Sequence, residues 1–191
     1  MKKIILTLFL SSTIFAQEKA TNLTSLHINV LGVGINYERA ITNKITILGN
    51  ANYSIIGLSG DRDGFDTDST VKLGLEGRYY YNFDRRISKG KSTDNNSANY
   101  ISLKLDYFTD WLSTYEGMGK DDDFSKLTVN YGIKRNFSKN FFYEFNFGAG
   151  FLIDTYYPYR VSVNGSDWIY SDKKTEIIFI PELGFKVGYN F

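Results

Sequence analysis

The chain has 191 residues with 22 Lys and Arg, 21 Asp and Glu, and no Cys. The near-neutral charge gives no electrostatic signature of a nucleic-acid partner, and the absence of Cys excludes disulfides, thiolate metal sites, a Cys nucleophile and a lipid-modified Cys. The 15 Tyr, 15 Phe and 17 Gly, set against 2 Pro, favour strands and turns over helices.

The beginning of the chain predicts a secretory signal peptide. Two lysines form a basic start, residues 4–10 form an apolar run broken by one Thr, and Ala16 supplies a small residue at the expected cleavage site. The run is shorter than the ~20 apolar residues that a spanning helix needs. We therefore expect residues 1–16 to be removed and residues 17–191 to form a single mature domain.

The rest of the chain alternates between apolar and polar residues. From Phe141 to Ile153, the odd positions are almost all aromatic or aliphatic, and the even positions are mostly polar or Gly. Successive side chains of a strand point to opposite faces, so this pattern predicts strands with one apolar face. Leu48 and Ile56 interrupt the otherwise polar face. The predicted strands are 23–31, 33–41, 45–58, 70–83, 100–113, 125–137, 141–163 and 167–191.

The connections between these strands differ in length. Residues 42–44 and 138–140 are tight turns, whereas the loops 59–69 and 114–124 are longer, and each of these two loops carries a net charge of −3. Residues 84–99 are rich in Ser, Asn and charged side chains, which predicts a flexible, solvated loop. An even number of strands puts both chain ends on one side, which in outer-membrane barrels is the periplasm.

The polar face is expected to line the inside of a closed, antiparallel, up-and-down transmembrane β-barrel of eight strands. The interior of such a barrel is only wide enough for side chains, and the aromatic side chains are too many to fit there. With the charges paired inside, the apolar face meets lipid and the closed ring leaves no backbone group unpaired in hydrocarbon. A soluble lipocalin-like carrier is the alternative. The expected lumen charge network is Glu38, Glu76, Arg78, Lys104, Asp106, Lys134, Glu144, Glu182 and Lys186.

Aromatic residues gather near both ends of the predicted strands, as in the girdles of membrane barrels. Ordinary enrichment of aromatic residues in strands is the alternative. The set at the periplasmic side is Tyr81, Phe83, Phe137, Phe141, Tyr189 and Phe191, and the set at the outer side is Tyr53, Trp111, Tyr156 and Tyr157.

The last strand carries a family resemblance. Phe185, Val187, Tyr189 and Phe191 alternate with polar residues or Gly up to a terminal Phe. This ending looks like the assembly signal of the small eight-stranded outer-membrane barrels, the OmpA/OmpX-like group, which the whole of residues 22–191 resembles in pattern. The resemblance implies the outer membrane of a Gram-negative bacterium, with periplasmic chaperones and the barrel-assembly machinery as partners. It brings no catalytic motif and no cofactor.

His27 is the only histidine of the chain. Ser25 and Asn29 share its face, and Glu38 is the nearest carboxylate in sequence on the polar face. Some outer-membrane barrels are lipid-modifying hydrolases with a Ser, His and acid set. A lone strand His is more often a packed or lumen-lining residue. We therefore expect no enzyme activity.

Two segments at the outer side stand apart. Oxygen-rich loops can bind Ca²⁺, so the carboxylates around Gly64 form a candidate site, with a solvated acidic loop as the alternative. These carboxylates are Asp61, Asp63, Asp66 and Asp68. The last hairpin keeps its strand pattern up to an Asn164-Gly165 turn. Because ~9–11 residues cross a bilayer, this hairpin is expected to project outward above a sloped rim.

These features predict an integral outer-membrane protein with a structural, adhesion or surface-binding role through its extracellular loops and C-terminal hairpin. Outer-membrane lipid, lipopolysaccharide and an extracellular protein are the expected partners, with no nucleic acid. Two alternatives stay open: a narrow porin-like channel for small solutes, and a lipid-modifying enzyme centred on His27. Open aqueous channels are expected only at ~16 strands.

Overall fold

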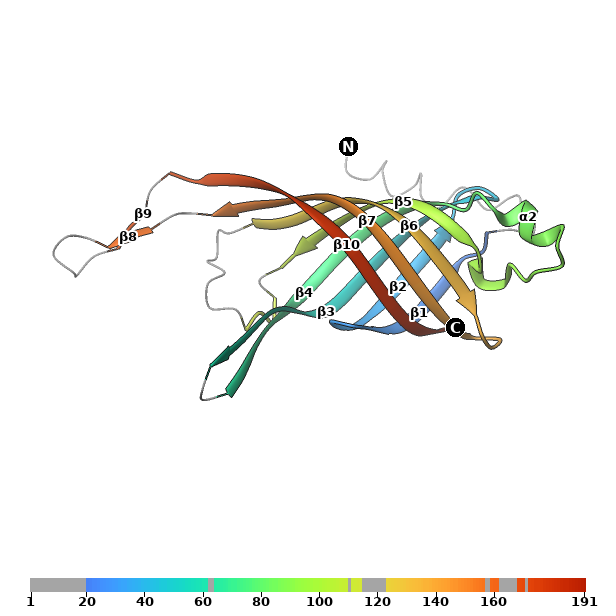
Figure 1. Cartoon of the computed structure of the whole chain (residues 1–191), viewed down its shortest axis with the longest axis horizontal. Helices are drawn as coiled ribbons and strands as arrows, with labels where there is room; N and C mark the ends of the chain where they lie inside the picture. The colour runs from blue at the N-terminus through green and yellow to red at the C-terminus, as the bar shows by residue number, and fades with distance from the viewer. Residues whose placement is uncertain are drawn as a thin grey trace, which may run out of the picture.

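The computed structural model describes residues 20–61, 64–109, 111–114, 123–156, 159–161, 168–170 and 172–191. Its main body is a closed antiparallel barrel with the strand order β1-β10-β7-β6-β5-β4-β3-β2 (Figure 1). The all-β, eight-stranded, up-and-down fold predicted above is therefore confirmed. The strands of the barrel are β1 (Leu23–Asn29), β2 (Gly32–Ala40), β3 (Ile45–Asp61), β4 (Gly64–Tyr79), β5 (Asn99–Phe108), β6 (Asp123–Asn136), β7 (Phe141–Tyr156) and β10 (Lys174–Asn190).

Four short elements of the described chain lie outside the ring of strands. The strands β8 (Tyr159–Val161) and β9 (Trp168–Tyr170) pair with each other as a separate two-stranded sheet. The helix α2 (Phe83–Ile87) and the 3₁₀ turn η1 (Asp94–Asn96) lie between β4 and β5. Among the described residues, no helix has the length and apolar character needed to cross a bilayer.

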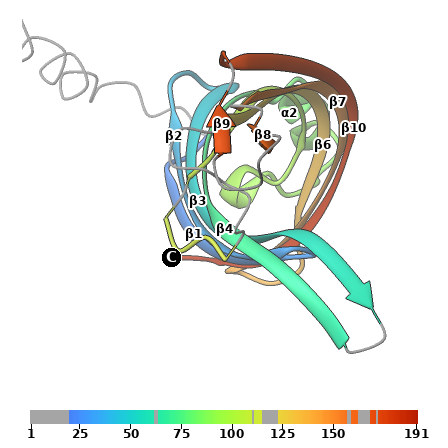
Figure 2. The same cartoon turned by 90° about the vertical axis from the view of Figure 1, so that its left-hand side faces the viewer.

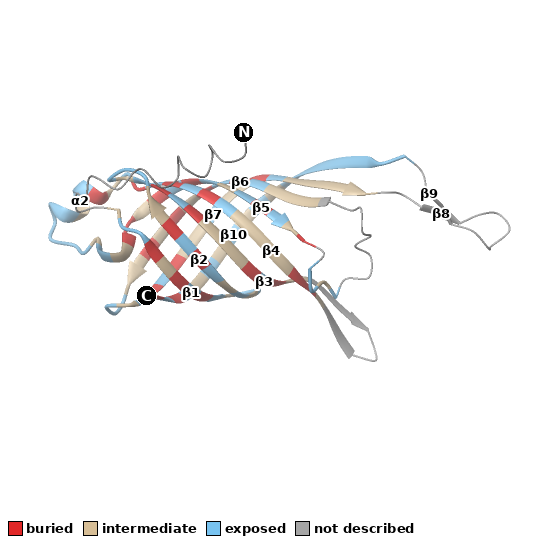
Figure 3. Cartoon of the chain, turned by 180° about the vertical axis from the view of Figure 1, so that it is seen from behind, coloured by how far each residue is buried: buried red, intermediate tan, exposed pale blue. Residues whose placement is uncertain are grey.

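The alternation of the sequence becomes an alternation of burial along each strand (Figure 3). In β5, Ile101, Leu103 and Leu105 are exposed, whereas Ser102 and Asp106 are buried. The apolar side chains therefore point away from the ring and the polar ones point into it. Leu48 is buried between Glu38 and Glu76 of the neighbouring strands, as its position on the polar face requires.

The two ends of the barrel differ. At the end that we call the terminal end, the start of β1 pairs with the end of β10, and tight turns join β2 to β3 and β6 to β7. At the opposite end, which we call the hairpin end, the strands have unequal lengths. The β1–β2 turn comes early, at Val30–Leu31, whereas β3 and β4 stay paired as far as Asp61↔Gly64. The rim is therefore sloped, and the β3–β4 hairpin splays away from the ring (Figure 2).

Several predicted boundaries were wrong. Residues 59–61 and 64–69 were predicted as part of a loop but are paired strands of the β3–β4 hairpin. A two-stranded ribbon keeps its backbone hydrogen bonds without the apolar alternation that would reveal it in the sequence. The strand predicted over 100–113 ends at Phe108, where Thr109 donates its hydroxyl to the Val71 carbonyl at 2.8 Å.

The last predicted hairpin is also not continuous. The strand β7 ends at Tyr156 and β10 begins at Lys174, with the β8–β9 sheet separate from both. The Asn164-Gly165 turn lies outside the described residues, as do residues 1–16.

The segment 84–99 is ordered against the terminal end of the barrel rather than forming a loose loop. Phe83 and Ala98 are fully buried with Tyr80 and Tyr100, and the rings of Phe83 and Tyr80 stack at 4.9 Å. The helix α2 is also tied to the β2–β3 turn by an ion pair between Lys44 and Asp84 at 2.5 Å. Apolar anchors at both ends of a polar segment thus hold it under the barrel.

The turn η1 binds the start of the described chain. The Thr21 backbone N–H donates to Asn96 Oδ1 at 2.8 Å, and Asn96 Nδ2 donates to the Thr21 carbonyl at 3.0 Å. Asn95 and Asn96 have φ angles of 49° and 60°, a backbone region that Asn tolerates better than most residues.

Most of the described side chains of the two aromatic sets lie on the outer face, but two do not. Phe83 is buried, and Tyr156 shares the face of Glu144 on β7 and donates its hydroxyl to Glu176 at 2.9 Å. The other side chains of the first set are exposed on the outer surface of the terminal end. In the second set, Tyr53 and Trp111 are exposed and Tyr156 is half-buried, while Tyr157 lies outside the described residues.

Candidate functional site

The interior of the barrel holds two layers of charged side chains. The first, which we call the lower charge cluster, lies nearer the terminal end and consists of Glu38, Glu76, Arg78, Lys134, Glu144 and Lys186. Three carboxylates face three cations, so its formal charge is zero. All of these residues belong to the predicted lumen network, and the structure brings them together from β2, β4, β6, β7 and β10.

Arg78 and Glu144 form the centre of the lower charge cluster. The guanidinium donates to both carboxylate oxygens of Glu144, at 3.0 and 2.9 Å, and to Glu76 at 2.8 Å. Lys186 and the Tyr100 hydroxyl each approach Glu144 Oε1 at 2.8 Å. Bidentate Arg–carboxylate pairs are among the strongest charge-assisted hydrogen bonds. The arrangement therefore clamps strands on opposite parts of the wall.

Glu38 has its own set of partners. Its Oε1 accepts hydrogen bonds from Tyr80 at 2.6 Å and from Thr46 at 2.7 Å, and Lys134 lies 3.5 Å from its Oε2. The Lys134 ammonium also sits 4.9 Å from the centroid of the Phe142 ring. A buried carboxylate with this many donors is satisfied and leaves no open acidic group at this level of the interior.

Sequence reasoning missed Tyr80 and Tyr100 as parts of this site. Both are fully buried, and Arg78 lies over the Tyr100 ring at 4.3 Å. The sequence did carry a signal for them. Both residues have even numbers, like Arg78 and Lys104, which places them on the polar face of their strands. Aromatic residues on that face are rare in this chain, and each of these two carries a hydroxyl to a buried carboxylate.

The second layer, which we call the upper lysine cluster, lies nearer the hairpin end and consists of Lys72, Lys104, Lys126, Asp106 and Glu182. Lys104 lies 2.7 Å from Glu182 and 3.1 Å from Asp106, and Lys126 lies 3.2 and 3.4 Å from the same two carboxylates. Lys72 has the longest contact, 3.6 Å to Asp106. Three cations face two carboxylates, which leaves a formal charge of +1.

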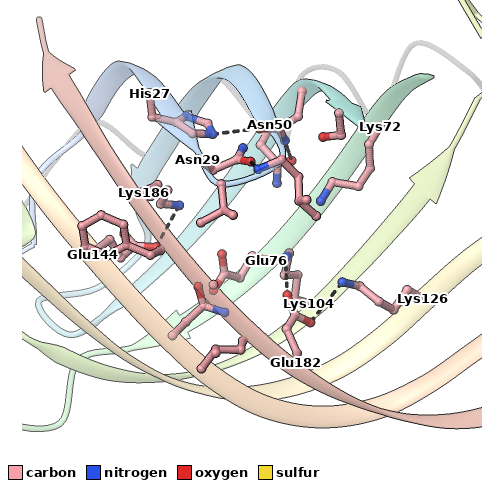
Figure 4. Close-up of a pocket in the computed structure, with 18 of the residues that line it drawn as sticks. His27, Asn29, Asn50, Lys72, Glu76, Lys104, Lys126, Glu144, Glu182 and Lys186 are labelled. Atoms are coloured by element: carbon pink, nitrogen blue, oxygen red, sulfur yellow. Dashed lines mark hydrogen bonds and ion pairs between the residues drawn. The ribbon is translucent and has the colours of Figure 1, made fainter. Parts of the chain in front are cut away.

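A cavity of about 350 Å³ extends from the lower charge cluster, past the upper lysine cluster, toward the hairpin end. Lys72, Lys104 and Lys126 reach into it from β4, β5 and β6, and Glu182 and Lys186 reach into it from β10 (Figure 4). The cavity is blocked toward the terminal end by the lower charge cluster and by the packed rings of Tyr80, Phe83 and Tyr100. The described interior is therefore closed toward the terminal end.

His27 lines the same cavity and is buried. Its Nε2 pairs with Asn52 Oδ1 at 2.7 Å, and Asn52 donates in turn to Asn50 at 2.6 Å. Within the described residues, no hydrogen bond joins His27 to Ser25 or Glu38. Ser25 instead accepts a hydrogen bond from Asn36 at 3.3 Å. The histidine is thus held by an amide and not by a carboxylate, unlike the base of a catalytic triad.

Three of the four candidate Ca²⁺ ligands lie on the β3–β4 hairpin. Asp61 ends β3 opposite Gly64, Asp66 pairs with Ser59, and Asp68 pairs with Gly57. Asp63 lies outside the described residues. Across the part of the chain that is described, no three His, Asp or Glu side chains are grouped so that they could hold a metal ion.

The residues of the predicted assembly signal form the outer face of the end of β10. Phe185, Val187, Tyr189 and Phe191 are all exposed, and Val187 and Tyr189 pair with Ile28 and Leu26 of β1 where the ring closes. Tyr189 also contacts the ring of Phe141 at 5.1 Å. This face belongs to the same apolar outer surface as the rest of the wall.

Comparison of the chain with protein-family models, with curated proteins and with solved structures found no match.

Proposed function

We propose that the protein is an integral outer-membrane barrel with a structural, adhesion or surface-binding role, carried by its hairpin end. The observation that supports this most strongly is the outer face of the wall, where all eight barrel strands expose large apolar side chains. Monomeric soluble proteins rarely expose apolar patches beyond a few hundred Å². An apolar surface that continues around a ring with a charged interior is what a bilayer stabilises.

The interior supports a closed barrel rather than a channel. The lower charge cluster and the Tyr80–Phe83 stack fill the cross-section near the terminal end with side chains that satisfy one another. A solute would have to break several buried ion pairs to pass this level, at a cost of several kcal/mol. The long hairpins at the opposite end are then the parts of the molecule that are free to bind other molecules.

Cell fractionation and surface labelling together test the proposal. The full chain, expressed in a Gram-negative host, is expected in the outer-membrane fraction and to need detergent for extraction. An epitope inserted between Asn164 and Gly165 is expected to bind antibody on intact cells. The matched insertion between Gly90 and Lys91, at the terminal end, is expected to bind antibody only after permeabilisation. Recovery of the protein from the periplasm without detergent would contradict the membrane location, and the reverse labelling pattern would contradict the orientation.

A further inference from the structure

The wall of the barrel has an opening on one side. The strand β1 covers β10 only from Asn190 to Lys186, and β2 covers β3 only up to Ser54. Beyond these points β10 continues to Lys174 and β3 continues to Asp61, and within the described ranges no strand pairs with the edges that face each other. We call this gap the lateral notch. Its floor is the β1–β2 turn at Val30 and Leu31.

Pro181 lies on the edge of this notch. The Phe191 N–H donates to Thr24 of β1, while the Asn190 N–H donates to Asn140 on the other side. The register between β10 and β7 is unbroken, so the backbone nitrogens of the other odd-numbered residues also face the β1 side. The nitrogen of Pro181 therefore faces the notch and carries no hydrogen. A proline at this position cannot donate a backbone hydrogen bond to an added strand. The notch is therefore poorly suited to bind an extended peptide by strand addition.

The lateral notch and the interior cavity are one continuous space. The cavity that contains Lys72, Lys104 and Lys126 is also lined by Leu31, Ile55 and Leu183. Leu31 belongs to the floor of the notch, and Ile55 and Leu183 belong to its two edges. Leu183 is 76 % exposed on the outer face of β10. A polar interior with excess positive charge thus opens sideways onto the apolar outer surface.

Charge complementarity indicates what this space holds. The upper lysine cluster has a formal charge of +1, and Lys72 has the weakest carboxylate contact of its three cations, at 3.6 Å. An ammonium group has three donors, and Lys72 contacts Asp106 through this ion pair and the face of the Phe108 ring at 5.9 Å. A monoanionic group in the cavity would neutralise the cluster and supply Lys72 with a short, charge-assisted hydrogen bond.

We propose that this space binds a long-chain fatty acid. The carboxylate lies at Lys72, beside Lys104 and Lys126, and the acyl chain leaves through the lateral notch between Ile55 and Leu183. A volume of about 350 Å³ is near the lower end of ligand pockets, which suits a small head group with one chain better than a two-chain lipid. The proposal rests on the membrane location proposed above, because the bilayer is the source of the ligand.

Photo-crosslinking tests the proposal directly. The purified full chain in phosphatidylcholine vesicles is exposed to a palmitic acid that carries a diazirine on its chain, and the labelled peptides are identified by mass spectrometry. Label is expected on β10 around Leu183 and on β3 around Ile55. Lys72→Gln is expected to reduce labelling about tenfold, the effect of losing one charge-assisted hydrogen bond. Lys89→Gln, at an exposed site of the terminal end, is expected to leave labelling unchanged.

Two further arms keep the test decisive. Leu183→Ala is expected to weaken labelling about fivefold through lost apolar contact. Leu103→Ala, on the outer face of β5 and away from the notch, is expected to leave labelling unchanged. Excess unlabelled palmitate is expected to compete, and its methyl ester and sodium acetate are not. Label spread evenly around the outer face, equal competition by the ester, or labelling unaffected by Lys72→Gln would each overturn the proposal. Flotation of the vesicles with the protein separates a failure of this site from a failure of membrane insertion.

Discussion

Arg78 of β4 and Glu144 of β7 form a two-pronged ion pair across the interior, at 3.0 and 2.9 Å, although β5 and β6 separate their strands in the ring. Both side chains are almost completely buried. Such a pair is costly to desolvate but even more costly to break, because the remaining partner is left as an isolated buried charge. The pair therefore locks the relative positions of non-neighbouring strands.

Removing one partner of this ion pair is expected to destabilise the barrel strongly. Arg78→Met should lower the free energy of unfolding by ~3–5 kcal/mol, as for other buried pairs that lose one partner. The double variant Arg78→Met with Glu144→Gln should recover part of this loss, because it removes both charges. Urea unfolding of the barrel in vesicles, followed by Trp fluorescence, measures both. Glu144→Gln alone is measured as well, and a double variant that loses the full sum of the two single losses would contradict the coupling.

Gly132 lies beneath the ring of Tyr100 on the neighbouring strand. A Cβ atom at Gly132 would lie 2.0 Å from Tyr100 Cζ, so the ring would have to move away from Glu144. Gly132→Ala is expected to destabilise the barrel by ~1–3 kcal/mol, the usual cost of overpacking. Gly77→Ala is the matched control, since nothing lies within 4 Å of its added Cβ. Equal unfolding midpoints for the two variants would show that Tyr100 does not hold the position described.

The segment under the barrel is expected to depend on one aromatic anchor. Phe83→Ala should cost ~3–5 kcal/mol because it empties a fully buried site against Tyr80. Ile87→Ala, on the exposed side of the same short helix, should change stability by less than ~0.5 kcal/mol. Limited proteolysis between residues 84 and 98 provides a second readout, with faster cleavage expected only for the Phe83 variant. Identical cleavage rates would rule out the anchor.

The filled interior also predicts an electrical property. In planar bilayers the protein is expected to show no steady conductance, because the lower charge cluster and the Phe83 packing close the terminal end. An unrelated open porin in the same bilayers is the control for the recording. Steady single-channel steps that persist after purification would favour the narrow channel instead.

The strands, and the face on which each side chain lies, could be predicted because residues at odd and even positions of a barrel strand point to opposite faces of the wall. Ser102 lies inside and Leu103 outside for this reason alone. Phe83 was misplaced because its burial depends on α2, a helix of five residues that is too short to show a helical period. The β3–β4 ribbon beyond Gly57 was missed because backbone pairing there needs no apolar pattern.

The lateral notch was predicted only in part. A sloped rim was expected, but the extent to which β1 covers β10 depends on the register between segments far apart in sequence, about which strand alternation carries no information. The significance of Lys72 likewise depends on Asp106 and on the strands that bring the two residues together, whereas its position on the polar face was visible in the sequence.

Depth-dependent fluorescence quenching tests the membrane assignment most directly. The chain has no Cys, so single variants Leu103→Cys, Val129→Cys and Lys89→Cys each carry one fluorophore. Leu103 and Val129 are paired neighbours on the outer face of β5 and β6. In vesicles, their fluorophores should be quenched by lipids spin-labelled on the acyl chain and not by aqueous iodide, with the reverse at Lys89. Iodide quenching of all three sites to the same extent would contradict an apolar face turned toward lipid.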